Sequence, residues 1–240
     1  MKARHSIFTR EISDSQRNML QMKVCANELL PRIAGLSLFK NCTTAEVKML
    51  LTKLDCRVKS FAAGEIVIHE CDPSSSVVVV LSGLIQVFEC GINDDSRHLV
   101  QRLYEDQTFG ATFPATEIPH CPGMLQAEAP SEVLFISVSA IREMQQSLTT
   151  QFFWNLYAAA STQGFYAWRK LRLLSCYEIA DRVLLYLKWR KEDGHLEPAH
   201  FRYGDLAMYL GVNRTALYRA IANLRKQRKI SVNGDKISLT

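Results

Sequence analysis

The feature that most constrains the fold is a helical stretch from Ser139 to Ser175 that contains no proline and a single glycine. Apolar and small side chains recur along it at alternating intervals of four and three residues, at Phe153, Tyr157, Ala160, Gly164, Ala167, Leu171 and Leu174. This spacing is typical of a helix that packs lengthwise against a second helix. The pattern therefore predicts a long helix with a seam for a partner helix.

A symmetric dimer is the simplest source of that partner, because the segments before and after the helix cannot both cover its whole length. The small residues Ala160 and Gly164 at the centre of the seam would let two backbones approach closely. The alternative is a single helix buried against its own domain. The further aromatic side chains that favour this alternative are Phe152, Trp154, Phe165, Tyr166 and Trp168.

The region before the helix is rich in β-forming residues. From Cys56 to Gly110, short runs of Val, Ile and Phe are separated by turn sequences such as AAG, DPSS and GINDD, and a last run ends near Val138. Short strands joined by turns are typical of a small antiparallel barrel or jelly roll. A helical segment is expected before the barrel, with Thr43 or Thr44 as its N-cap and its end near Leu54.

The long helix is expected to stop and restart at Ser175, where SCYE has the spacing of a capping box. We predict a hinge at this point. The amphipathic helix that follows has an apolar face made of Ile179, Val183, Leu184 and Leu187, and Gly194 lies near its end.

The net charge of +5 is concentrated in the C-terminal part of the chain. Residues 1–174 contain 17 basic and 17 acidic side chains, whereas residues 175–240 contain 12 and 7. A neutral region followed by a basic one indicates a polyanionic partner for the C-terminal part.

The basic region has the proportions of a helix-turn-helix. Two short helices are predicted on either side of LGVN, where Gly211 suits a tight turn. The side chains expected to form their shared core are Leu206, Ala207, Leu210, Leu217, Ile221 and Leu224. In this motif the second helix lies in the major groove of DNA and its N-terminal residues face base edges. The side chains on its outward face are Asn213, Arg214, Thr215, Tyr218 and Arg219.

The basic residues of this helix are expected to have two roles. An Arg near the helix start, as Arg214 is, suits a bidentate contact with guanine. Arg225 and Lys226 lie near the helix end and suit phosphate contacts. The sequence ISVNGDKISL then predicts two short strands joined at Asn-Gly, the wing of a winged helix. Together these features predict DNA binding.

Other classes of protein find little support. The seven cysteines are odd in number and form no CxxC pair, so neither a disulfide framework nor a structural zinc site is expected. No run of eighteen apolar residues and no secretory signal is present, and we expect a cytoplasmic protein. The absence of a phosphate loop, a nucleophile elbow and HExxH predicts that the chain is not an enzyme.

The barrel, long helix, hinge and winged helix-turn-helix together resemble the Crp/Fnr family of bacterial transcription regulators over nearly the whole chain. The most specific matches are YLGVNRTALYRAI, SVNGDKISL, the turns AAGE and LSGLIQVF, and DQTFG. The resemblance implies an α+β fold with a cyclic-nucleotide-binding-like β-barrel sensor domain (1–140), a dimerisation helix (141–174) and a winged helix-turn-helix DNA-binding domain (175–240). It also implies a homodimer that reads an inverted-repeat DNA site, allosteric control by an effector held against the long helix, and contacts with RNA polymerase.

The chain departs from the cyclic-nucleotide-binding members where those hold their ligand. Their Gly-Glu pair, which binds the ribose, is Gly110-Ala111 here, and their Arg-Ser pair, which neutralises the phosphate, is Cys121-Pro122. A buried phosphate without its Arg would be an unpaired charge, so we expect no tight binding of cyclic AMP. An iron-sulfur cluster is also unexpected, because Cys25 is alone near the N-terminus.

Three alternatives for the signal stay open. The first is an organic ligand between barrel and helix. Its expected pocket consists of Phe109, Gly110, Ala111, Phe113, Cys121, Met124, Leu125, Trp154 and Gln163. The second is haem bound by His69, His98 or His120. The third is redox sensing by Cys121, which requires an exposed thiolate of low pKa.

The recognition helix departs from the family pattern too. Arg214-Thr215 stands where the best-known members have Arg-Glu, and Arg202 replaces the Ser or Thr that usually caps the preceding helix. The resemblance therefore predicts Arg214 and Arg219 as DNA contacts but no half-site sequence. A different class of function also stays open, in which the basic domain only anchors a binding module to nucleic acid through charge.

Overall fold

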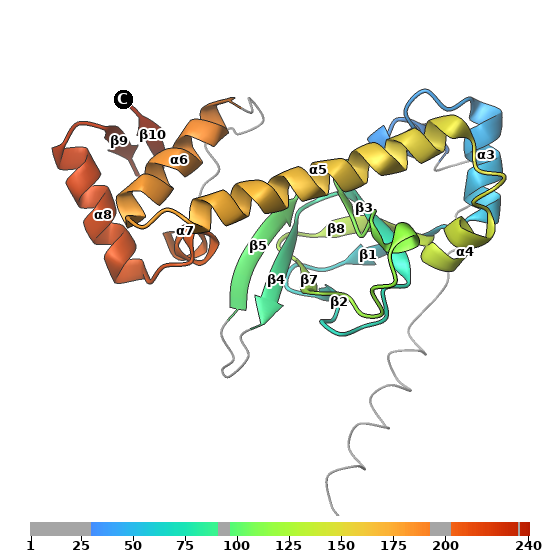
Figure 1. Cartoon of the computed structure of the whole chain (residues 1–240), viewed down its shortest axis with the longest axis horizontal. Coiled ribbons are helices and arrows are strands. Elements are labelled where there is room, and N and C mark those ends of the chain that lie inside the picture. Colours follow the sequence, from blue (N-terminus) through green and yellow to red (C-terminus); the bar gives the residue numbers. More distant parts are fainter. Residues whose placement is uncertain (1–29, 91–96, 193–202, 235) are drawn as a thin grey trace, which may run out of the picture.

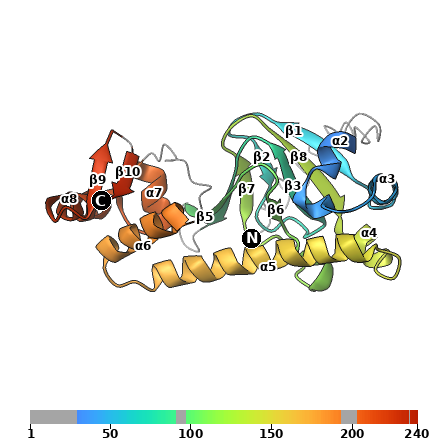
Figure 2. The same ribbon diagram turned by 90° about the horizontal axis from the view of Figure 1, so that it is seen from above.

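The computed structural model describes residues 30–90, 97–192, 203–234 and 236–240. Its long helix α5 (Thr150–Leu174) runs along a β-barrel and continues to a smaller C-terminal domain (Figure 1, Figure 2). The architecture is α+β, with an antiparallel barrel-like N-terminal part, as the sequence predicted.

Short helices precede the barrel and lie beside the N-terminal half of α5 (Figure 1). They are α2 (Leu30–Ala34), the 3-10 helix η1 (Ser37–Phe39) and α3 (Thr44–Lys53). The Thr43 hydroxyl accepts a hydrogen bond from the Glu46 N–H, and the Glu46 carboxylate accepts one from the Thr43 N–H. This complete capping box fixes the start of α3 at one of the two positions that the sequence predicted.

The barrel consists of two four-stranded antiparallel sheets, with the orders β1-β8-β3-β6 and β2-β7-β4-β5. The strands are β1 (Arg57–Phe61), β2 (Ile66–Ile68), β3 (Ser76–Ser82), β4 (Ile85–Cys90), β5 (Arg97–Leu103), β6 (Thr108–Phe109), β7 (Met124–Ala127) and β8 (Ser131–Ser137). Between β6 and β7 the chain forms the 3-10 helix η2 (Phe113–Ala115).

The sheets enclose a single large core, which explains the sequence of the central strand. β3 has the continuous apolar run Val77–Leu81, and all five of these side chains are buried. Strands that are covered on both faces lose the alternation of apolar and polar residues. The same core extends to α3 and to the buried side chains Phe152 and Leu156 of α5, so the barrel and the first half of α5 are packed together.

The predicted helical stretch from Ser139 to Ser175 is in fact two helices. The short helix α4 (Val138–Glu143) ends before α5 begins, and the Thr149 hydroxyl caps α5 by accepting from the Phe152 N–H. The continuous-helix prediction was wrong because the segment Ser-Leu-Thr-Thr offers cap-forming hydroxyls where the seam pattern has not yet started.

The C-terminal domain is a three-helix unit followed by a hairpin. Its elements are α6 (Ile179–Glu192), α7 (Tyr203–Leu210), α8 (Arg214–Lys226), β9 (Ile230–Asn233) and β10 (Lys236–Leu239). All six predicted core side chains of α7 and α8 are buried in one cluster. Gly211 in the turn has φ +64, a conformation that favours glycine. The helix-turn-helix and its wing are therefore confirmed as structural elements.

The predicted capping box at Ser175 is wrong. Ser175 is the C-cap of α5, and its hydroxyl donates to the Leu171 carbonyl instead of capping the next helix. The helix does stop and restart here, because α5 ends at Leu174 and α6 begins at Ile179. Gly194, Arg202 and Cys25 lie outside the described residues.

Candidate nucleic-acid interface and ligand pocket

Helix α8 divides into a buried apolar face and an exposed basic face. Leu217, Ile221 and Leu224 face the domain core. The exposed side chains are Arg214, Thr215, Tyr218, Arg219, Arg225 and Lys226. The positive face of the helix is therefore available to a polyanion, while the apolar face holds the helix in the domain.

Asn213 has a structural role that its outward position had not indicated. It is the N-cap of α8, and its side-chain oxygen accepts from the Ala216 N–H at 2.7 Å. This oxygen satisfies one of the free N–H groups at the helix start. The side chain is exposed, but it is held by the helix that it caps.

Two residues of α7 that no sequence motif indicated contact the exposed face of α8. The rings of Tyr203 and Tyr218 are stacked with centroids 4.8 Å apart. The guanidinium of Arg214 lies against Gly204, where an added Cβ would be 2.3 Å from Nη2. The start of α7 thus positions both an aromatic and a basic side chain of α8.

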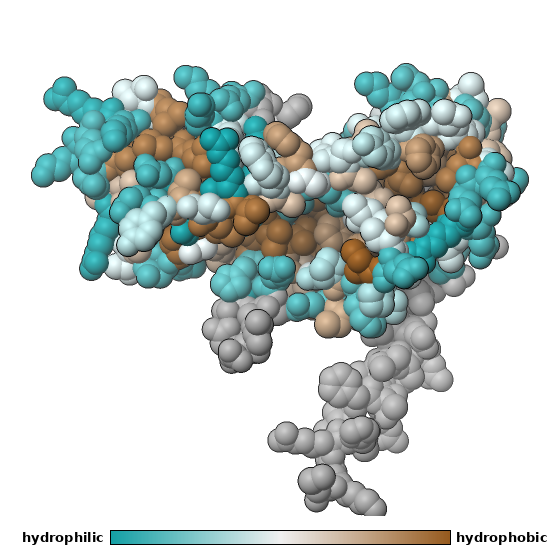
Figure 3. Space-filling view, in the orientation of Figure 1, coloured by the Kyte–Doolittle hydropathy of each residue, from teal (hydrophilic) through white to brown (hydrophobic). Residues whose placement is uncertain are grey.

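Helix α5 exposes a large apolar surface along most of its length. The exposed fractions of Phe153, Tyr157, Leu171 and Leu174 lie between 41% and 65%, and a Cβ on Gly164 would meet no atom within 4 Å. All belong to the predicted seam, whereas Ala160 packs partly against the barrel core. Trp154, Phe165 and Trp168 are also at least half exposed, so these aromatics are not buried against their own domain. Figure 3 shows that exposed apolar side chains gather around the middle of the molecule.

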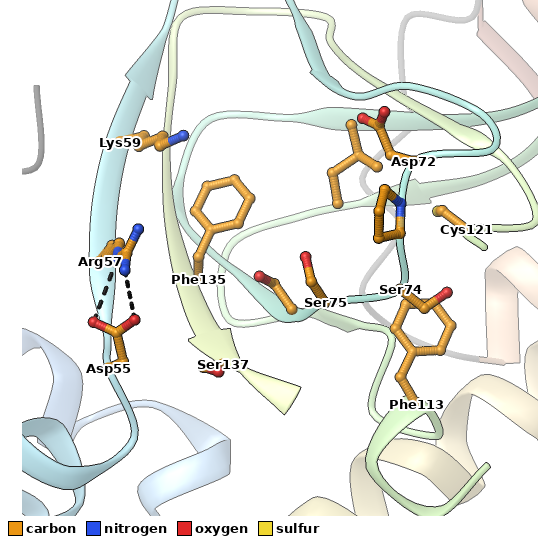
Figure 4. Close-up of a pocket in the computed structure, with 13 residues that line it drawn as sticks. Asp55, Arg57, Lys59, Asp72, Ser74, Ser75, Phe113, Cys121, Phe135 and Ser137 are labelled. Carbon is orange, nitrogen blue, oxygen red and sulfur yellow. Dashed lines mark hydrogen bonds and ion pairs between the residues drawn. The ribbon is translucent and has the colours of Figure 1, made fainter. Parts of the chain in front are cut away.

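A pocket of about 420 Å³ lies between β1, the end of β8 and the loop before β3 (Figure 4). Its lining includes Arg57 and Lys59. These two residues could not be predicted as pocket residues, because alternating basic side chains on a short strand are also typical of an ordinary exposed surface. Arg57 donates to both carboxylate oxygens of Asp55, and the Lys59 ammonium lies 5.4 Å from the centre of the Phe135 ring. The Ser74 hydroxyl is buried without a hydrogen-bond partner. The pocket therefore combines an aromatic face with charged and hydroxyl groups.

The structure divides the predicted effector residues into separate groups. Phe113 and Cys121 line the pocket of Figure 4. Those buried in the barrel core are Phe109, Gly110, Ala111 and Leu125. Gln163 of α5 accepts from the Ala111 N–H at 3.2 Å, so the loop after β6 does touch the long helix.

Two of the predicted pocket residues lie elsewhere. Met124 is the neighbour of Leu125 on β7 and points to the opposite face, where it forms a separate cluster with Phe88 and Leu99. Trp154 is 57% exposed on the free face of α5. Met124 was misplaced because neighbouring residues of a strand point to opposite faces of the sheet. Trp154 was misplaced because it lies on the face of α5 that is turned away from the barrel.

The environment of Cys121 does not match a redox-sensing thiol. Its side chain is 2% exposed and its Sγ donates to the Gly123 carbonyl at 3.0 Å. Burial raises the pKa of the Cys121 thiol, whereas a reactive cysteine needs a lowered pKa and access. His69, His98 and His120 are exposed, and within the described ranges no three potential metal ligands cluster together.

Comparison with known proteins identifies the fold. The sequence model of one protein family, the cyclic nucleotide-binding domain, matches residues 58–147. No curated protein matches the sequence. None of the described helices is long and apolar enough to cross a membrane.

Several solved structures resemble the chain at low sequence identity. FixK2 from Bradyrhizobium japonicum is 20% identical, with a TM-score of 0.61, over 77% of this chain and 92% of that one. CLP from Xanthomonas campestris, described as a c-di-GMP responsive global regulator, is 16% identical, with a TM-score of 0.66, over 82% and 99%. A putative regulator of the Crp/Fnr family from Eubacterium rectale is 14% identical, with a TM-score of 0.61, over 84% and 92%. The chain therefore has, over most of its length, the fold of the Crp/Fnr family of transcription regulators.

Proposed function

We propose that this chain is a signal-responsive transcription regulator that binds double-stranded DNA as a homodimer and catalyses no reaction. The observation that carries the proposal is the exposed basic face of α8 within a winged helix-turn-helix. The fold and the surplus of basic residues after position 175 support it. We place the protein in the bacterial cytoplasm, with RNA polymerase as a further partner on the basis of the family resemblance.

In this proposal α8 lies in the major groove. Arg214 and Thr215 at its N-terminal end face base edges, together with Tyr218 and Arg219 on the following turn. Arg225 and Lys226, at the far end, contact phosphates. The exposed tip of the wing, at Gly234 between β9 and β10, provides a further approach to the DNA backbone.

The dimer is proposed to form along α5. Its exposed seam residues are apolar or small, and soluble monomers rarely leave such a surface open. Open space above Gly164 lets a second helix approach closely. A twofold axis between the two copies of α5 would place two recognition helices for an inverted repeat, whose half-site centres are about 34 Å apart.

The effector is proposed to be a small organic molecule other than cyclic AMP. Ala111 has no group for a ribose hydroxyl, and Cys121 is a buried neutral thiol where a phosphate would need a cation. The link from Ala111 to Gln163 offers a route by which occupancy near this loop would change the position of α5. Isothermal titration should show no micromolar binding of cyclic AMP.

The experiment that tests the function is selection of binding sites from a random duplex pool at physiological salt. Enrichment of an inverted repeat is the expected result. Arg219→Ala should weaken binding to the selected site by about 1–3 kcal/mol if Arg219 reads a base. Lys188→Ala is the matched control, because Lys188 is an exposed cation on α6 and lies outside the recognition helix. Binding with a steep salt dependence and no enrichment would instead mean a non-specific electrostatic anchor.

A further inference from the structure

The winged helix domain of this chain is attached to its barrel through more than the hinge. Helix α7 lies against β5 at the side of the barrel that faces the C-terminal domain (Figure 1, Figure 2). Three groups of contacts hold the two domains together. Together they form what we call the docking contact, which consists of Arg102, Lys170, Asp205, Met208 and Tyr209 with the barrel cluster Phe88, Leu99 and Met124.

The first group is an ion pair across the domain boundary. Arg102 of β5 donates to the Glu128 carboxylate at 2.8 Å and to the Asp205 carboxylate at 2.9 Å. Glu128 belongs to the barrel, whereas Asp205 lies in the first turn of α7. The Arg102 side chain is only 9% exposed and that of Asp205 is 20% exposed. A charge pair so shielded from water is coupled much more strongly than a surface pair.

The second group joins α5 to both domains. The Lys170 ammonium donates to the carbonyl of Leu99 on β5 at 3.0 Å and to the carbonyl of Tyr209 on α7. It also lies 3.9 Å from the centre of the Tyr209 ring. Burial lowers the pKa of Lys170 to about 8, as expected for an ammonium enclosed between three elements.

The third group is apolar. Phe88, Leu99 and Met124 form a buried cluster on the outer face of β4, β5 and β7, and Met208 and Tyr209 of α7 pack against it. This explains why a barrel strand carries large apolar side chains on both faces at Met124 and Leu125. Without α7 the cluster would be exposed to water, which is costly in proportion to its apolar area.

None of the proposed DNA contacts takes part in the docking contact. Arg214, Arg219 and Arg225 are exposed although the domain is docked. Two recognition helices bind an inverted repeat only when their separation matches successive major grooves, about 34 Å. A domain tied to its sensor at three groups of atoms keeps one orientation relative to α5, whereas a domain tied only through residues 175–178 would sample many orientations.

We propose that the docking contact is a conformational lock that holds the winged helix domain in the orientation that binds DNA. The inference rests on the proposed function and adds its regulation: a signal that moves α5 or β5 acts on DNA binding by closing or opening this contact. Lys170 on α5 and Arg102 on β5 are the residues through which such movements reach α7.

The test compares two variants, each of which neutralises one of the two carboxylates that pair with Arg102. Asp205→Asn breaks the pair that crosses the domain boundary, and Glu128→Gln breaks the pair inside the barrel. Affinity for the selected duplex is measured by fluorescence anisotropy, and opening of the contact by hydrogen exchange of α7 and β5. Asp205→Asn should accelerate exchange in both elements and weaken specific binding at least about fivefold, whereas Glu128→Gln should change binding less than about twofold.

The direction of the effect makes the test decisive. Asp205→Asn removes a negative charge from a DNA-binding domain, so simple electrostatics predicts tighter binding. Unchanged exchange, or binding equal to or tighter than that of the wild type, would overturn the proposal. Met208→Ser, which removes an α7 side chain from the apolar cluster, provides a second variant in case Asp205→Asn does not fold, and the same loss of specific binding is expected. If the wild-type protein selects no duplex at all, the proposed function fails, while the hydrogen exchange of the same variants still decides whether the lock exists.

Discussion

Gly204 shows how one residue outside the recognition helix sets the position of a side chain inside it. A methyl group at this position would occupy the place of the Arg214 guanidinium. We expect Gly204→Ala to leave thermal stability unchanged or higher, because Ala favours helix more than Gly does. Specific DNA binding should nevertheless fall about threefold to tenfold, since Arg214 must move. Thermal unfolding and anisotropy titration test this, and unchanged affinity would show that Arg214 does not need its contact with α7.

The cysteines differ in burial, and we expect their reactivity to differ accordingly. Burial raises the pKa of the Cys56 thiol to about 12 and also raises the pKa of Cys121, whereas Cys71 is exposed. Since the thiolate is the nucleophile, iodoacetamide at pH 8 should label Cys71 at least about tenfold faster than either buried thiol. Peptide mass mapping over a time course measures the three rates. Rapid labelling of Cys121 would favour the redox alternative that its surroundings oppose.

The exposed seam of α5 leads to a prediction for the whole helix. Ala167 lies on this seam and is exposed, so Ala167→Glu should place two carboxylates in the dimer interface and produce monomers that no longer bind an inverted repeat. Thr162→Glu is the matched control, because Thr162 is exposed on the same helix but off the seam. Light scattering coupled to size exclusion gives the mass of each variant. A dimeric Ala167→Glu protein would contradict pairing through α5.

Elements whose apolar residues recur at regular short intervals could be predicted from the sequence. Contacts between elements that are distant in the sequence could not. The apolar positions of α7 and α8 and the glycine turn between them are confirmed because each is defined within a few residues. The side of β7 that faces the barrel could not be predicted, since Met124 is covered only after α7 docks on it. Arg102 and Asp205 were missed for the same reason: they are 103 residues apart.

On the scale of the whole molecule, the docking contact links two separate cores. The barrel core includes Phe152 of α5, and the C-terminal core includes Leu173 at the other end of the same helix. Lys170 lies between them and binds both domains. A change in the stability of this contact should therefore appear in the unfolding of the entire chain rather than of one domain.

The lowered pKa of Lys170 gives this coupling a pH dependence with a defined sign. A free lysine keeps its proton up to a pKa of about 10.4, whereas docked Lys170 loses it near pH 8. The undocked and unfolded states thus bind more protons between these values, and docking is favoured as the pH rises from 8 towards 10. The free energy of unfolding of the wild type should increase relative to that of Lys170→Met by about 2 kcal/mol between pH 7.5 and 9.5. Because other groups titrate in both proteins, the difference between the two denaturation curves isolates Lys170. A difference that is constant with pH, or that shrinks, would mean that the ammonium is not desolvated in the docked state and that its carbonyl contacts are made in water.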